Sequence, residues 1–245
     1  MIPVRRIAWL MAAILPMTAS ATPVTYDFSG SIDFASATVT DSGDYLTPIF
    51  PFGTTFSGSF TYDDAALPQT PLPGYDLYLN SITAGNVSFG SDGSLGTFAL
   101  GPSYPFGDTR TSNITVLDGP ATGLNFSDEL DVAMSLAPQV GDPAYLYRHM
   151  GISGISFDAD VIGPGQNISD PLPFDEFQQQ GYLAFSFGFE QYDADGNSIN
   201  QKSVGAQAQD FQISRVSVPE PATMPLWIVA LLGLGAMRRR TRQGD

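Results

Sequence analysis

Apolar and polar residues alternate with a period of two along several stretches, as they do in strands with one buried face. The longest stretches are Tyr26–Phe34, Thr55–Tyr62, Leu130–Leu136 and Leu183–Glu190. Shorter candidates are Tyr75–Ile82, Asn86–Phe89, Asn113–Leu117, Tyr145–Tyr147, Ile155–Phe157 and Phe211–Val216. The pattern therefore predicts many short antiparallel strands around a single core.

Turn sequences rich in Gly, Pro and Asp separate these strands. They include Asp41-Ser-Gly43, Asp92-Gly93, Gly163-Pro-Gly165 and Asp195-Gly-Asn197. Only Phe174–Gln180 is a candidate helical turn in this part of the chain. We predict an all-β body over residues 22–217, an antiparallel β-sandwich or jelly roll without an internal linker. An N-terminal signal helix and a short C-terminal apolar helix are expected outside this body.

Two segments of this body echo each other, Phe28-Ser-Gly-Ser31 and Phe56-Ser-Gly-Ser59. Two copies do not establish a repeat array. A strand pattern that both segments share accounts for them.

Residues 1–21 have the features of a secretory signal peptide. Arg5 and Arg6 precede the apolar stretch Ile7–Leu15, and Ala19-Ser20-Ala21 forms a small-x-small pattern before Thr22. The alternative, a permanent membrane helix, needs about 20 apolar residues, which this stretch does not supply. We expect cleavage by signal peptidase between Ala21 and Thr22.

The C-terminal end carries a second signal of three parts. Val218-Pro219-Glu220-Pro221 precedes the apolar run Leu226–Met237, which is followed by Arg238, Arg239, Arg240 and Arg242. As a helix this run would rise only ~18 Å, which is short of a hydrocarbon core of ~30 Å. The arginines are expected to stay cytoplasmic, which places the body outside the inner membrane. Both ends therefore predict the same topology.

This three-part tail over residues 218–242 resembles the PEP-CTERM sorting signal, a region also labelled an ice-binding-protein C-terminal domain. The resemblance implies a Gram-negative bacterium that makes exopolysaccharide, and processing by a membrane-embedded exosortase near the motif. Pro219, Glu220 and Pro221 are then recognition residues for another enzyme. The protein would be anchored transiently in the inner membrane and then reach the cell surface or the extracellular matrix.

The alternative is a tail that stays unprocessed and serves as a permanent membrane anchor. The tail is an address shared by unrelated bodies, so the label does not predict ice binding.

The charge distribution narrows the choice of partner. Residues 22–237 contain 24 acidic side chains against four basic ones, which gives a net charge of −20. Such a body repels phosphate backbones and is not expected to bind nucleic acid. The chain has no cysteine, which excludes disulfides and thiolate metal sites.

No pattern of residues predicts catalysis or a histidine metal site. The single histidine, His149, is expected to be structural or exposed, and no Gly-x-Ser-x-Gly elbow occurs. The adjacent acid pairs are Asp63-Asp64, Asp128-Glu129 and Asp175-Glu176. Neighbours on a strand point to opposite faces, so these pairs are expected to lie in solvated turns rather than to form a dyad.

One acidic segment superficially resembles a calcium loop. In Asp193-Ala-Asp195-Gly-Asn197 the glycine falls at position four rather than six, and Val204 replaces the glutamate at position twelve. A hairpin turn is favoured, and calcium stays a weaker alternative. No other cofactor is expected.

These observations favour a non-enzymatic protein of the cell surface or matrix, with a structural, adhesive or polysaccharide-associated role. Exposed tyrosines could stack on sugars, although most aromatic residues are expected in the core. The alternatives are a secreted polysaccharide hydrolase or lyase, whose carboxylates converge from distant segments, and a calcium-stabilised adhesion module.

Overall fold

The computed structural model describes residues 23–39, 50–69, 74–101, 112–119, 128–142, 144–157, 160–163, 165–207 and 210–217. The expected signal peptide and apolar C-terminal helix lie outside these residues, as does the turn expected at Asp41–Gly43. The described residues up to Arg215 belong to one compact unit.

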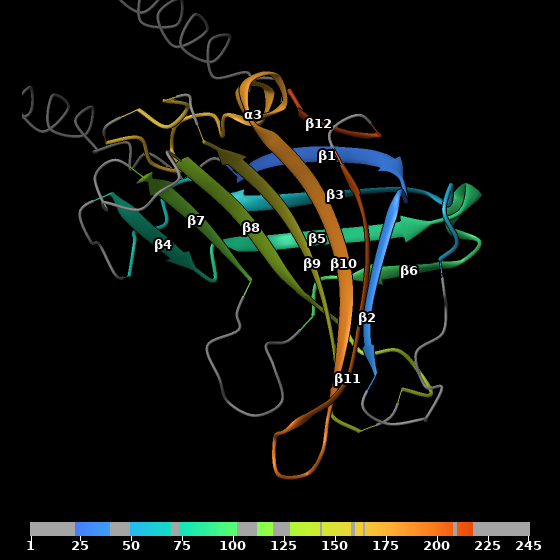
Figure 1. Cartoon of the computed structure of the whole chain (residues 1–245). Coiled ribbons are helices and arrows are strands. Elements are labelled where there is room, and N and C mark those ends of the chain that lie inside the picture. Colours follow the sequence, from blue (N-terminus) through green and yellow to red (C-terminus); the bar gives the residue numbers. More distant parts are fainter. Residues whose placement is uncertain are drawn as a thin grey trace, which may run out of the picture. The chain divides into compact units, whose positions relative to one another are not determined.

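Two antiparallel sheets pack face to face, which confirms the predicted all-β sandwich (Figure 1). The first sheet has the strand order β12 (Phe211–Arg215), β1 (Pro23–Ser31), β3 (Thr55–Asp63), β5 (Ile82–Phe89) and β6 (Gly96–Ala99). The second has the order β2 (Phe34–Val39), β11 (Ser198–Gln207), β10 (Tyr182–Tyr192), β9 (Leu146–Ser156), β8 (Asp128–Leu136), β7 (Asn113–Asp118) and β4 (Tyr75–Leu79). A 3-10 turn, η1 (Ser91–Gly93), follows β5, and the predicted helical turn is confirmed as α3 (Phe174–Gln180).

Most of the predicted strands are present, and several of them have different limits. Tyr26–Phe34 is not one strand, because the chain leaves the first sheet after Ser31 and enters the second at Phe34. Tyr75–Ile82 is also interrupted, at Asn80, whose φ of 55° is outside the strand region. The two short candidates around Tyr147 and Ile155 are the ends of one long strand, β9.

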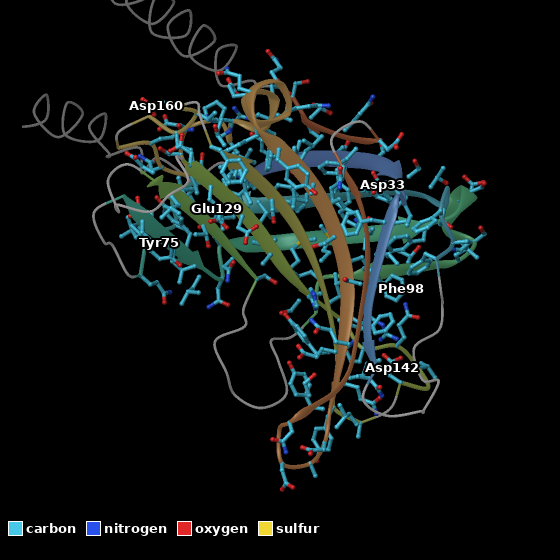
Figure 2. All side chains as sticks on the ribbon, viewed as in Figure 1. Asp33, Tyr75, Phe98, Glu129, Asp142 and Asp160 are labelled. Atoms are coloured by element: carbon cyan, nitrogen blue, oxygen red, sulfur yellow. The ribbon has the colours of Figure 1, made fainter. Side chains whose placement is uncertain are left out.

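The chain crosses from the first sheet to the second between β1 and β2, and it crosses back between β11 and β12. The two crossings lie side by side. The Ser31 N–H donates to the Asp210 carbonyl at 3.0 Å, and the Asp33 N–H donates to the Gly205 carbonyl at 2.9 Å. The Asp33 carboxylate accepts a hydrogen bond from the Gln207 N–H at 3.0 Å. Figure 2 shows Asp33 where β1 gives way to β2. These bonds satisfy backbone groups that the sheet ladders leave open at the corner.

The two echoing segments pair with each other in the first sheet. In the antiparallel register of β1 and β3, Phe28 lies opposite Gly58 and Gly30 lies opposite Phe56. A Cβ atom at Gly58 would lie 2.4 Å from the Phe28 ring, and one at Gly30 would lie 2.8 Å from the Phe56 ring. Each phenylalanine therefore covers the glycine of the other segment.

The same two rings connect the sheets. Phe28 and Phe56 lie 5.6 and 4.1 Å from the ring of Phe185 on β10, measured between ring centroids. Phe211 of β12 lies 5.9 Å from Phe185. Aromatic pairs at such distances contribute about 0.5–1.5 kcal/mol each beyond their buried area. The expectation that most aromatic residues pack in the core is thus confirmed for this cluster.

Replacing Gly58 by alanine should lower the free energy of unfolding by about 1–3 kcal/mol, because the new methyl group overlaps the Phe28 ring and the Asn86 carbonyl. Urea denaturation of the mature protein measures this change. Gly163→Ala is the matched control, since no atom lies within 4 Å of its Cβ position. Equal stability of the two variants would contradict the proposed packing.

Candidate functional site

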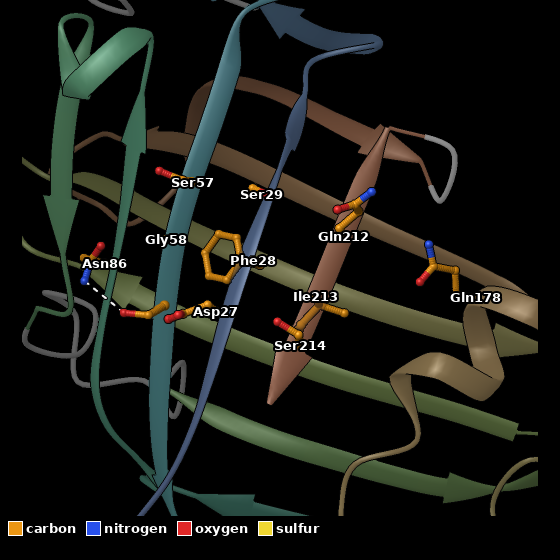
Figure 3. Close-up of a pocket in the computed structure, with 11 residues that line it drawn as sticks. Asp27, Phe28, Ser29, Ser57, Gly58, Asn86, Gln178, Gln212, Ile213 and Ser214 are labelled. Carbon is orange, nitrogen blue, oxygen red and sulfur yellow. Dashed lines mark hydrogen bonds between the residues drawn. The ribbon is translucent and has the colours of Figure 1, made fainter. Parts of the chain in front are cut away.

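The pairing that buries the phenylalanines also aligns short polar side chains on the outer face of the first sheet. One row across the strands is Gln212, Ser29, Ser57, Ser88 and Thr97, and the next row is Ser214, Asp27, Ser59 and Asn86. We call these nine residues the serine face. Most of the side chains are short, and all of the nine except Ser88 and Thr97 border a shallow hollow of about 710 Å³, beside which Gln178 of α3 lies (Figure 3).

Hydrogen bonds connect neighbouring strands on the serine face. The Asn86 Nδ2 donates to the Ser59 Oγ at 3.2 Å, and the hydroxyls of Ser88 and Thr97 are 2.9 Å apart. Asp27 is the one charged residue among the nine. Uncharged hydroxyls and amides both donate and accept hydrogen bonds, so the face is suited to a hydroxyl-rich polymer. It offers no aromatic ring, because the Phe28 ring beneath the hollow is buried in the core.

The acid pair Asp128-Glu129 is divided between the two faces of β8, as expected for neighbours on a strand. The expectation of a solvated turn is wrong for this pair, because both residues lie on a strand and the side chain of Asp128 is fully buried. Its carboxylate accepts hydrogen bonds from the N–H groups of Ile162 at 2.9 Å, Val161 at 2.6 Å and Gly119 at 3.4 Å. These donors replace water around the buried carboxylate, so Asp128 has a structural role.

A different pair of carboxylates lies on the outer face of β8. Glu129 and Asp131 are two residues apart on the strand, which places them about 7 Å from each other. Burial raises the pKa of both carboxyls, and the charge of Asp131 raises the pKa of Glu129 further. Ser153 donates a hydrogen bond to Asp131, which partly offsets the effect of burial on the pKa of Asp131. The expectations drawn from the sequence covered adjacent acids and acids that converge from distant segments, and they missed this i, i+2 spacing.

His149 lies on the outer face of the second sheet, on β9. Its ring stacks on Tyr147, with centroids 5.4 Å apart and planes 22° from parallel. The hydroxyl groups of Tyr147 and Ser135 are 3.1 Å apart, which positions the tyrosine ring.

The neighbouring Arg148 points the other way, into the core. Its guanidinium binds the Asp142 carboxylate and lies 5.4 Å from the centre of the Phe98 ring. Burial disfavours the charged form of Asp142, but the hydrogen bonds from Arg148 and from the Gln139 N–H hold its pKa below the ordinary value. The pair has a structural role. The Asp142 carboxylate and the Phe98 ring both stabilise the buried positive charge of Arg148 at the edge of the aromatic core.

The segment that resembles a calcium loop forms the hairpin between β10 and β11. Asp193 accepts hydrogen bonds from the N–H groups of Asp195 and Asn197, at 2.9 and 2.8 Å, and from the Asn197 Nδ2 at 2.9 Å. The bonds from Asn197 hold the pKa of Asp193 below its ordinary value. The predicted hairpin turn is confirmed. Within the part of the chain that the structure describes, no group of three or more His, Asp or Glu residues is placed to hold a metal ion.

The processing residues predicted from the sequence lie outside the described residues. They are Ala19, Ala21 and Thr22 of the signal peptide, Val218, Pro219, Glu220 and Pro221 of the sorting motif, and the arginine cluster at 238–242. Among the described helices, none is long and apolar enough to cross a bilayer. No family model, curated protein or solved structure matches this chain.

Asp128→Ala should destabilise the protein by about 3 kcal/mol or more, because it leaves several buried N–H groups without an acceptor. Asp175→Ala is the control, since Asp175 is exposed and such changes alter stability by about 0.5 kcal/mol or less. Thermal unfolding followed by circular dichroism measures both variants. A midpoint for Asp128→Ala equal to that of the control would rule out the structural role.

Proposed function

We propose that this protein is an exported, non-enzymatic component of the bacterial surface or matrix that associates with polysaccharide. The support for export is the signal peptide at residues 1–21 together with the three-part tail at residues 218–242. Their charges favour one orientation, in which both arginine-containing ends face the cytoplasm during transit and the β-body lies outside. An exosortase-type enzyme would then act near Pro219-Glu220-Pro221.

The observation that favours binding to polysaccharide is the serine face. Across four or five strands it presents hydroxyl and amide groups with a single carboxylate, Asp27. Hydroxyl groups of a sugar polymer can both donate hydrogen bonds to such side chains and accept hydrogen bonds from them. The net charge of −20 on residues 22–237 disfavours anionic polymers, so a neutral polysaccharide fits best.

A polysaccharide hydrolase is the second candidate, and the pair Glu129 and Asp131 favours it. Their separation of about 7 Å is within the range of glycosidase carboxyl pairs. However, the two residues stand side by side on one strand, whereas glycosidase carboxylates flank the bond that they cleave. Asp131 also accepts a hydrogen bond from Ser153. The arrangement therefore supports binding better than hydrolysis.

The mature protein should cosediment with exopolysaccharide isolated from its own host and leave the polymer chains at their original length. Binding is measured from the bound fraction, and chain length from size-exclusion chromatography and reducing ends. A steady increase in reducing ends that the double variant Glu129→Gln, Asp131→Asn abolishes would establish the hydrolase instead.

Replacing Pro219, Glu220 and Pro221 together by alanine should leave the tail attached, because the processing enzyme loses its recognition motif. Mass spectrometry of protein from the envelope and medium should then detect residues 238–242, which the wild-type protein has lost. Thr223→Ala, just outside the motif, is the control and should be processed normally. Retention of the tail in the wild-type protein would instead indicate a permanent anchor.

A further inference from the structure

A groove crosses the outer face of the second sheet, on the opposite side of the sandwich from the serine face. Its floor consists of Ala133 on β8, Gly151 on β9 and Ser186 on β10, which are paired in register. These small side chains border a hollow of about 520 Å³. Because the row runs from strand to strand, we call this feature the transverse groove.

The two sides of the transverse groove differ in chemistry. On one side, Asp131 accepts a hydrogen bond from Ser153, its register partner on β9. On the other side, His149 and Tyr147 stack against each other, and Glu190 lies opposite Tyr147 on β10. Ser153 and His149 are four residues apart on β9, so the two sides are about 13 Å apart along the strand.

This arrangement matches the surface of a sugar chain. A pyranose ring has an apolar face of C–H groups and a rim of hydroxyls, and binding sites for small polar ligands combine aromatic rings with a few convergent polar groups. The partly exposed Tyr147 and His149 provide the rings, and the oxygens of Asp131 and Glu190 accept hydrogen bonds from hydroxyls. The same two carboxylates repel an anionic chain.

We propose that one neutral polysaccharide chain binds along the transverse groove, with a sugar ring against Tyr147 and His149 and sugar hydroxyls bonded to Asp131. The inference rests on the proposed function and assigns its binding site. The serine face, which has no exposed aromatic ring, is the alternative binding surface, and the experiment distinguishes it from the groove.

The test uses the mature protein purified from its host and the neutral fraction of the host's exopolysaccharide, separated from the acidic fraction by anion exchange. Isothermal titration calorimetry should show that Tyr147→Ala weakens binding at least about tenfold, the equivalent of about 1.4 kcal/mol. Tyr147→Phe, which retains the ring, should bind within about threefold of wild type. Ser186→Gln, which fills the groove floor, should also weaken binding and gives a second test if Tyr147→Ala unfolds.

Tyr182→Ala is the control and should bind like wild type, because Tyr182 is exposed on β10 and does not line the groove. Ser57→Ala and Gln212→Ala test the serine face as the alternative surface and should weaken binding less than Tyr147→Ala does. Loss of affinity in these two variants, with the groove variants unaffected, would overturn the groove assignment and leave the proposed function standing. Binding of the acidic fraction alone would overturn the assignment of a neutral chain. Absence of binding to either fraction would refute the proposed association with polysaccharide, and the groove assignment with it.

Discussion

The reciprocal pairing of Phe28 with Gly58 and of Phe56 with Gly30 is the contact on which the rest of the sandwich depends. The glycines leave space that the opposing rings fill, and the rings then reach Phe185 on the other sheet. A slip of β3 by one residue against β1 would turn the Phe56 ring toward solvent, since side chains alternate between the two faces of a strand. The register and the packing of the two sheets are therefore set by the same four residues.

This register also determines the chemistry of the outer surface. The serines that follow each phenylalanine point away from the core and align as Ser29 with Ser57, which produces the serine face with its single charged residue, Asp27. On the second sheet a comparable row of small residues, including Ala133, Gly151 and Ser186, forms the floor of the transverse groove. Small side chains thus create both hollows, but of the two only the transverse groove combines a hollow with partly exposed aromatic rings. This difference is why the groove, rather than the serine face, is the better site for a sugar chain.

Period-two alternation predicted the strands well where bulky and polar residues alternate, as in Leu183–Glu190. It failed at Ile32-Asp33, where the alternation continues although the chain passes from one sheet to the other. The hydrogen bonds of Asp33 to Gly205 and Gln207 hold this corner, and the sequence does not show them. It also missed β11, whose many polar residues conceal its pairing with β10.

Neither the serine face nor the transverse groove could be predicted, since each is assembled from strands that the sequence does not place side by side. Asp128 was misjudged for the same reason, because its partners at Val161 and Ile162 are distant in the chain.

The most direct test of this account is a nuclear Overhauser measurement on the mature protein in solution, with the phenylalanine rings and glycines selectively labelled. The account predicts close contacts from the Phe28 ring to the Gly58 α-protons and from the Phe56 ring to the Gly30 α-protons, with both pairs of α-protons shifted upfield by the rings. Contacts from Phe28 to residues 57 or 59 instead, with unshifted glycine protons, would contradict the register from which both the core and the serine face are derived.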